Sequence, residues 1–143
     1  DLTYIDEDGE RKRPVMLHRV IFGSIERFIG ILTEHYAGAF PAWLAPVQVM
    51  VIPVSDAQLE YAQNIEKALL KQGLRVEMDS RSESIGKKIR AAQLQQIPYM
   101  LIIGDREQAA GAVSVRHRRD GDMGSMTLDA FAEHLVGEVS ERR

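Results

Sequence analysis

The fold is decided by the stretch Val47-Gln-Val-Met-Val-Ile-Pro-Val54, an almost unbroken run of apolar, mostly β-branched residues. Such a run predicts a strand that is covered on both faces, as in a parallel sheet flanked by helices. The next four residues, Ser55 to Gln58, have the spacing of a capping box and predict the start of a helix. Its apolar face would consist of Leu59, Ala62, Ile65 and Leu69. Gly73 is placed to end that helix as a C-cap.

Two further strands and a second helix follow in alternation. Residues 74–79 predict a strand with charges at alternate positions, which favours a place near an edge of the sheet. Ser84 begins a helical pattern that stops before Pro98. Residues 99–104 form the most apolar run that follows, and we expect this strand to lie at the centre of the sheet.

The last part of the chain predicts a fourth strand and a closing helix. Residues 111–118 alternate between apolar and polar side chains, and Thr127 precedes a run with helical spacing. Strand–helix–strand–helix–strand, followed by a hairpin-like strand and a helix, predicts an α/β fold. The sheet would be mixed but mostly parallel, with helices on both faces.

The first residues predict a hairpin that precedes this fold. Residues 2–5 form a short strand candidate, and the Asp-Gly pair within residues 6–10 is a hairpin-turn signal. Residues 13–22 would be the returning strand, with Val20-Ile-Phe22 as a buried apolar run. A helix should then extend from Ser24 to about Tyr36.

A hairpin and one helix make a poor core for independent folding, so this part is expected to be the trailing edge of a larger domain. The two prolines in the stretch from Phe40 to Pro46 favour extended backbone and indicate a boundary. We therefore expect one unit over residues 1–44 and a second over residues 45–143. Because the sequence begins with Asp1, we also expect a piece of a longer protein.

Composition narrows the class of protein. The 143 residues are 45% hydrophobic and 27% charged, as in an ordinary globular domain. The chain has no cysteine, which excludes disulfides and thiolate metal sites and is compatible with a cytosolic origin. No apolar run approaches the roughly 20 residues that cross a bilayer. The net charge is −3, yet residues 81–119 carry +5. That segment is either a patch that binds phosphate or a solvated basic face.

Two places have side chains suited to a ligand. At Gly23-Ser24 a strand would turn into a helix that carries Arg27, an arrangement that suits an anion but also occurs as an ordinary corner with a solvated arginine. In the fourth strand we expect Val113 and Val115 to pack in the core, so Arg116 should point outward. Its planar guanidinium can there donate two hydrogen bonds to a base edge or to a phosphate. Glu107 follows the central strand, where open α/β sheets bind ligands. A surface salt bridge between Glu107 and Arg116 is the alternative.

The segment from His18 to Arg27 resembles the third signature motif of class II aminoacyl-tRNA synthetases, in the form found in threonyl-tRNA synthetases. Its features are His18, an apolar run, a glycine and Glu26-Arg27. The continuation from Tyr36 to Gln48 is similar to the crossing into the anticodon-binding domain of that family, and the resemblance extends over nearly all of the chain. It implies the C-terminal portion of an enzyme that joins threonine to tRNA(Thr) through an ATP-dependent threonyl-adenylate. This portion would mainly recognise the anticodon.

The resemblance also implies roles for individual residues. Glu107, in Gly104-Asp-Arg-Glu107, and Arg116 match family positions that contact anticodon bases, as single-stranded RNA readers do. Ser82 stands where the family has an asparagine, so a hydroxyl replaces an amide in a third contact. Arg27 matches the catalytic arginine that contacts ATP phosphates, and Ser24 lies on the adenosine side of that pocket.

His18 is similar to a zinc ligand of the family, whose two other protein ligands lie upstream of this sequence. Zinc needs about three protein ligands in an open site. We therefore expect zinc, ATP and magnesium to belong to the full-length enzyme, and this chain alone to bind no cofactor and to be catalytically inactive. The implied parent is a cytoplasmic homodimer without membrane contact, formed through the absent catalytic part.

Two alternatives remain. One is a free-standing RNA-binding module that resembles an anticodon domain but has no synthetase activity. The other is a nucleotide-binding flavodoxin-like regulator, for which the loop at Pro53-Val-Ser-Asp56 makes an unconvincing phosphate cradle.

Overall fold

The computed structural model describes residues 1–142 and separates into two compact units, Asp1–Leu32 and the residues from Thr33 onward. In the first unit, strands β1 (Tyr4–Ile5) and β2 (Arg11–Lys12) pair antiparallel. The hairpin turn between them is closed by a bond from the Gly9 amide to the Asp6 carbonyl (2.8 Å) and by ion pairs of Lys12 with Asp6 and Asp8. The predicted hairpin is therefore present, but both strands are very short.

Helix α1 (Ile25–Tyr36) has the predicted bounds. The prediction of a strand over residues 13–22 is wrong. That segment has no regular strand or helix, and Val20, Ile21 and Phe22 are 79%, 81% and 59% exposed. A strand forms only where a neighbour accepts and donates its backbone hydrogen bonds, and no described strand pairs with this segment. None of the α1 residues is buried.

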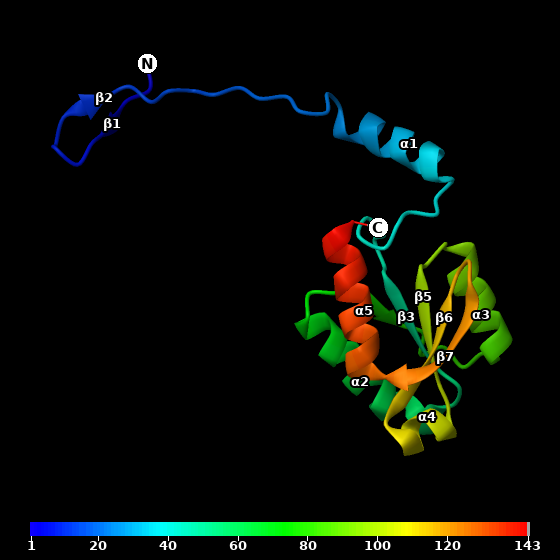
Figure 1. Cartoon of the computed structure of the whole chain (residues 1–143). Coiled ribbons are helices and arrows are strands. Elements are labelled where there is room, and N and C mark those ends of the chain that lie inside the picture. Colours follow the sequence, from blue (N-terminus) through cyan, green and yellow to red (C-terminus); the bar gives the residue numbers. More distant parts are fainter. Residues whose placement is uncertain (143) are drawn as a thin grey trace. The chain divides into compact units, whose positions relative to one another are not determined.

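The second unit is built on a five-stranded sheet with the order β4-β3-β5-β6-β7 (Figure 1). Its strands are β3 (Val49–Pro53), β4 (Val76–Met78), β5 (Tyr99–Ile103), β6 (Ala112–His117) and β7 (Gly121–Thr127). Strands β4, β3 and β5 run parallel, and β6 and β7 are added antiparallel. The mixed sheet, the edge position of β4 and the central position of β5 confirm the predictions.

Helices cover both faces of this sheet. They are the short 3₁₀ turn η1 (Asp56–Gln58), α2 (Leu59–Lys71), α3 (Ile85–Leu94), α4 (Asp105–Ala110) and α5 (Leu128–Glu141). Two of the predicted signals work as expected. The capping box from Ser55 to Gln58 forms, and the Thr127 hydroxyl accepts the Ala130 amide at 3.2 Å to cap α5. Within residues 1–142 there is no helix long and apolar enough to cross a membrane.

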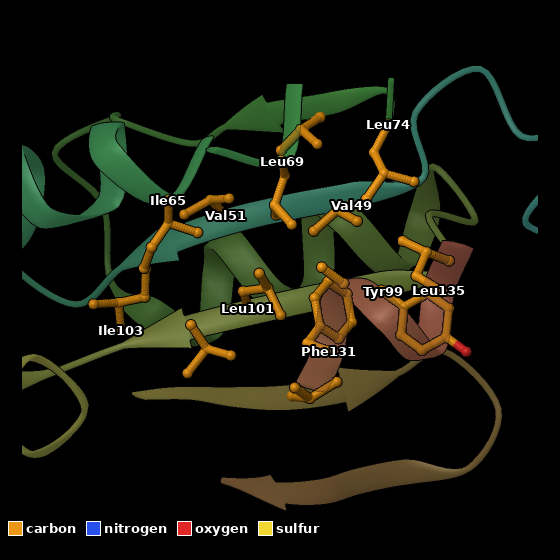
Figure 2. Packing of buried hydrophobic residues seen from close by; sticks show 14 of the residues in the cluster. Val49, Val51, Ile65, Leu69, Leu74, Tyr99, Leu101, Ile103, Phe131 and Leu135 are labelled. Carbon is orange, nitrogen blue, oxygen red and sulfur yellow. The ribbon is translucent and has the colours of Figure 1, made fainter. Parts of the chain in front are cut away.

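The core lies in two layers on opposite faces of the sheet, because alternate strand residues point to opposite sides. Figure 2 shows the larger layer, in which Val49, Val51, Leu101 and Ile103 of the sheet meet Ile65 and Leu69 of α2 and Phe131 and Leu135 of α5. On the other face, Met50, Ile52 and Met100 pack against α3 through Ala92 and the following Ile97. No residue of β6 or β7 belongs to this smaller described cluster, and β6 places the polar Ser114 and Arg116 on that side.

Two elements of this unit were not predicted. Residues 105–110 form helix α4, and residues 121–127 form the edge strand β7 instead of a connection to the last helix. Strand β7 lacks the usual apolar alternation, since its residues Gly121 to Thr127 include two glycines and an aspartate. Only its pairing with β6 makes it a strand.

Candidate nucleic-acid interface

Three loops meet at the edge where the parallel strands β3, β4 and β5 end. The loop after β3 begins with Val54 and Ser55, the loop after β4 contains Asp79 to Ser84, and Gly104 follows β5. Open α/β sheets bind ligands at this edge, because backbone groups and loop side chains converge there. Two of the predicted RNA contacts lie at this edge: Ser82 is in the loop after β4, and Glu107 is in helix α4, which begins directly after Gly104.

Glu107 lies in the first turn of α4, where one of its carboxylate oxygens caps the helix. Its Oε2 accepts the Gly104 amide at 2.9 Å. A Cβ atom at Gly104 would come within 3.1 Å of this oxygen and 3.6 Å of Val54 Cγ2, so a larger residue would require the Glu107 carboxylate to shift by a few tenths of an ångström. The partly exposed Glu107 keeps a second oxygen that can accept a hydrogen bond from a base.

Ser82 is exposed in the loop between β4 and α3, and the preceding residues hold that loop in place. Arg81 forms a two-pronged pair with Asp79, with its Nε 2.9 Å from Oδ1 and an Nη 2.6 Å from Oδ2. This bond lowers the pKa of Asp79, a carboxyl that is 8% exposed. Ser82 lines a shallow cleft of about 340 Å³ together with Val54 from the first loop.

The two lysines of α3 have different environments, which the sequence did not indicate. Lys87 is exposed and pairs with Glu83 at 2.8 Å. Lys88 is only 4% exposed, and its Nζ donates to the Pro53 carbonyl at 3.1 Å. Lys88 therefore belongs to the interior that supports the end of β3. Both lysines belong to the basic segment 81–119, and the possibility that this segment offers its charges to phosphate does not hold for Lys88.

Arg116 lies on β6, on the side of the sheet that α3 covers only in part. It is directly opposite Met100 on β5 and Asp122 on β7, and opposite residues of an antiparallel pair share a face. Met100 is fully buried beneath α3, whereas Asp122 is exposed. Arg116 is thus at the margin where the covered part of this face gives way to solvent, as the alternation of the strand predicts.

The guanidinium of Arg116 has an unused buried donor. Within residues 1–142, the buried side-chain polar atoms without a hydrogen-bond partner are Nε of Arg116 and Nε of Arg118. A buried donor without an acceptor is unfavourable by about 1–3 kcal/mol, so this atom favours an incoming acceptor. Met100 is three residues before the end of β5, which separates Arg116 from the loop edge by about 10 Å along the strand. The structure does not show Arg116 and Glu107 as a salt bridge.

The remaining predicted site residues, His18, Ser24 and Arg27, are all exposed in the first unit. Ser24 caps α1 loosely, because its Oγ accepts the Arg27 amide at 3.4 Å while its hydroxyl donates to Glu26 at 2.7 Å. No group of three or more His, Cys, Asp or Glu side chains suited to a metal ion is found among the described residues. His18 therefore has no companions here with which to form a zinc site.

Two polar residues with long-range hydrogen bonds were missed by sequence reasoning. Gln58 joins the loop after β3 to the start of α4, and Arg118 joins β6 to residues 39–40. Their partners are 47 and 79 residues away, so no local pattern could reveal them. Helix α4 did leave a signal, because Gly104-Asp-Arg-Glu107 has the spacing of a capping box and Gly111 ends the helix in the left-handed conformation (φ 63°).

Comparison with known proteins identifies the family. A family model described as an anticodon binding domain matches residues 48–138. The threonine–tRNA ligase of Caldanaerobacter subterraneus subsp. tengcongensis is 60% identical over 142 residues, which are 99% of this chain and 22% of the relative. That of Carboxydothermus hydrogenoformans is 59% identical over 143 residues, 100% of this chain and 23% of the relative. The chain thus spans less than a quarter of the length of these relatives.

Solved structures agree with this result. The RNA binding domain of threonyl-tRNA synthetase from Cryptosporidium parvum Iowa II superposes with a TM-score of 0.78 at 37% identity, covering 95% of this chain and 35% of that one. Histidyl-tRNA synthetase from Nostoc sp. PCC 7120 superposes with a TM-score of 0.62 at 28% identity over 66% of this chain and 23% of its own. A free-standing module is not favoured, because the ligase similarity includes the residues before the anticodon-binding match. The chain belongs to the anticodon-binding domain family of aminoacyl-tRNA synthetases, in the form found in threonine–tRNA ligases.

Proposed function

We propose that this chain binds the anticodon loop of tRNA(Thr) and serves as the anticodon-recognising part of a threonine–tRNA ligase. The observation that carries this proposal is the unsatisfied Nε donor of Arg116 at the open margin of the sheet. A guanidinium there can offer two parallel donors to the edge of an unpaired base, and a base acceptor would satisfy the buried atom. The identity of 60% to a threonine–tRNA ligase supports the choice of tRNA.

Glu107 and Ser82 complete the proposed reading site from the loop edge. The second oxygen of Glu107 accepts from an amino or imino group of a base, while its first oxygen keeps α4 capped on the Gly104 amide. Ser82 contributes one hydroxyl from the adjoining loop, which the Asp79–Arg81 pair holds in place. Glu107 and Ser82 would contact the RNA from the loop edge, and Arg116 from the face of the sheet. Such separate contacts suit a single-stranded loop whose bases are turned outward.

We further propose that residues 1–44 form an edge of the catalytic domain of the parent ligase and that residues 45–143 form the anticodon-binding domain. In that parent, Arg27 and Ser24 would contact ATP, which with magnesium activates threonine, and His18 would be one of the zinc ligands. The exposed apolar residues of the first unit, such as Val20, Ile21 and Phe22, support this assignment because they lack a cover. The parent would be a homodimer.

The test replaces Arg116 by lysine and measures binding of anticodon stem–loop RNAs at two salt concentrations. Arg116→Lys keeps the charge but removes the two-pronged geometry, so the matching anticodon should lose about 1–3 kcal/mol and a mismatched one much less. Lys87→Ala is the control, because Lys87 is exposed and pairs only with Glu83 across one helical turn. It should weaken all RNAs about equally and reduce the salt dependence.

Glu107→Gln provides an independent arm of the same experiment. The amide oxygen can still accept the Gly104 amide, so α4 should stay capped, while the amide nitrogen presents a donor where the base needs an acceptor. The loss should therefore depend on the anticodon, as for Arg116→Lys. If Arg116→Lys, Glu107→Gln and Lys87→Ala all lower the affinity of every RNA to the same extent, recognition is only electrostatic and the proposal fails.

A further inference from the structure

A buried glutamine connects two of the loops at the carboxyl edge of the sheet. Gln58 is 2% exposed, and its Nε2 donates to Oδ1 of Asp105 at 2.7 Å. The two residues are 47 positions apart in the sequence. Gln58 ends the 3₁₀ turn after β3, and Asp105 is the first residue of α4. The bond therefore joins the loop after β3 directly to the helix that carries Glu107.

The orientation of the Gln58 amide is determined by its other contacts. Its Oε1 accepts two bonds from Ser55, one from the backbone amide at 3.1 Å and one from the hydroxyl at 2.7 Å. An oxygen is required at that end, because a backbone N–H can only donate. The Nε2 group must then face Asp105. Both ends of the buried amide are satisfied, as expected for a polar group that specifies one arrangement.

Helix α4 depends on polar contacts of this kind for its position. It has six residues, Asp105–Ala110, and none of them is buried. A helix this short is not stable by itself, and it has no buried apolar side chain to anchor it. Its first turn is held by the cap between Glu107 and Gly104 and by the bridge from Gln58 to Asp105. The cap connects Glu107 only to its own turn. The bridge connects that turn to the 3₁₀ turn that follows β3.

We propose that Gln58 is a positioning residue for anticodon recognition, which acts through Asp105 to hold the carboxylate of Glu107 where it meets a base. The proposal rests on the proposed function of the chain. It assigns to Gln58 no contact with RNA. Because a hydrogen bond to a base requires an accuracy of a few tenths of an ångström, a small shift of the first turn of α4 would affect the base that Glu107 reads. Contacts to phosphate tolerate such a shift.

The bridge can be broken and restored by exchanging donor and acceptor. Gln58→Glu keeps the oxygen that accepts from Ser55 but places a second carboxylate against Asp105, which repels it. Asp105→Asn retains an oxygen that accepts from Gln58, so this variant should keep the bridge. In Gln58→Glu/Asp105→Asn, the introduced amide donates to the introduced carboxylate, and the bridge should form again with reversed polarity.

The readout is the dissociation constant for stem–loops with one anticodon base changed, divided by the dissociation constant for a stem–loop with a threonine anticodon. If Glu107 supplies about 1–3 kcal/mol of discrimination, the ratio should fall roughly 5- to 150-fold in Gln58→Glu for the base that Glu107 reads. It should stay within about twofold of wild type in Asp105→Asn and in the double variant, a difference of only about 0.4 kcal/mol. Gln63→Glu introduces the same charge on the exposed side of α2 and is the matched control.

Two comparisons separate positioning from a loss of folding. In a Glu107→Gln background, Gln58→Glu should cause no further loss of discrimination, because the group through which it acts is already changed. Gln58→Met removes the bridge without adding charge, and it should also reduce discrimination if Gln58→Glu does not fold. Unchanged discrimination in both Gln58 variants, or no recovery in the double variant, would overturn the inference. If the wild-type chain itself does not discriminate between anticodons, the proposed function fails first, and the inference fails with it.

Discussion

Replacement of Arg118 by lysine should weaken the second unit at a point where three backbone segments meet. Arg118 directly follows β6, and its Nη1 donates to the Gln96 carbonyl at 2.7 Å. Its Nη2 donates to the Ala39 carbonyl at 2.9 Å and also to that of Phe40. The fork of the guanidinium makes these bonds in different directions at once. A lysine ammonium keeps the charge, but one nitrogen cannot reach both groups of acceptors.

The magnitude follows from the bonds lost and from the environment. A hydrogen bond from a charged donor contributes about 1.5–3 kcal/mol, and lysine should lose at least one of the two directions. Burial lowers the pKa of Arg118, which shows that its charge is partly withdrawn from water. The acceptors Ala39 and Phe40 are only partly buried, so water replaces some of the lost bonding. The substitution also removes the buried Nε of Arg118 that has no acceptor, which offsets part of the loss, so we expect the free energy of unfolding to fall by about 1–2 kcal/mol.

Denaturant unfolding of Arg118→Lys and of the wild-type chain measures this change, and the slope of the transition should stay the same. Arg119→Lys is the matched control, since Arg119 is the adjacent and exposed arginine. Hydrogen exchange should also become faster at the Ala39 amide, which bonds to the Tyr36 carbonyl at 2.9 Å. A loss below about 0.5 kcal/mol, the range of ordinary surface substitutions, would refute the role assigned to Arg118.

Two other changes test the electrostatics and the core. Because Arg81 lowers the pKa of Asp79 in the folded chain, the pair stabilises the fold above the unfolded pKa of about 3.9, and this contribution is lost as pH falls through the folded pKa. Asp79→Asn should therefore lower stability at neutral pH, and the difference from wild type should shrink at acidic pH. Phe131→Ala should reduce the free energy of unfolding by about 3–5 kcal/mol, because this fully buried ring packs edge-on against Tyr99 with centroids 5.6 Å apart. A conservative Phe131→Leu should lose distinctly less in the same denaturation experiment.

The elements with strong local signals were predictable from sequence. The apolar runs around Val49 and Leu101 identified strands β3 and β5, because a buried parallel strand needs apolar side chains on both faces. Capping residues such as Ser55 and Thr127 marked the starts of helices, because unsatisfied amides at a helix end require a nearby acceptor. The alternation of β6 also predicted that Arg116 lies on the face opposite to Val113 and Val115, but not that its Nε is buried there.

Only the tertiary structure showed which segments find a neighbouring strand to pair with. Strand β7 has no apolar pattern of its own and exists because β6 offers it a hydrogen-bonding edge. Conversely, Val20-Ile-Phe22 has the pattern of a strand but remains irregular, because no described strand pairs with it. Strand pairing depends on which neighbours are present, and neither periodicity nor propensity records this.

Dependence on distant neighbours also divides the candidate site into the part that the sequence by itself determined and the part that only the structure decided. The positions of Glu107 after a strand and of Arg116 within one could be predicted from local patterns, whereas their roles as RNA contacts were implied only by the family resemblance. The burial of Lys88 beneath the end of β3, the unsatisfied Nε of Arg116 and the bridge from Gln58 to Asp105 could not be predicted. Burial and long-range hydrogen bonds arise only when segments far apart in the chain are packed together, and they determine which charged groups remain exposed.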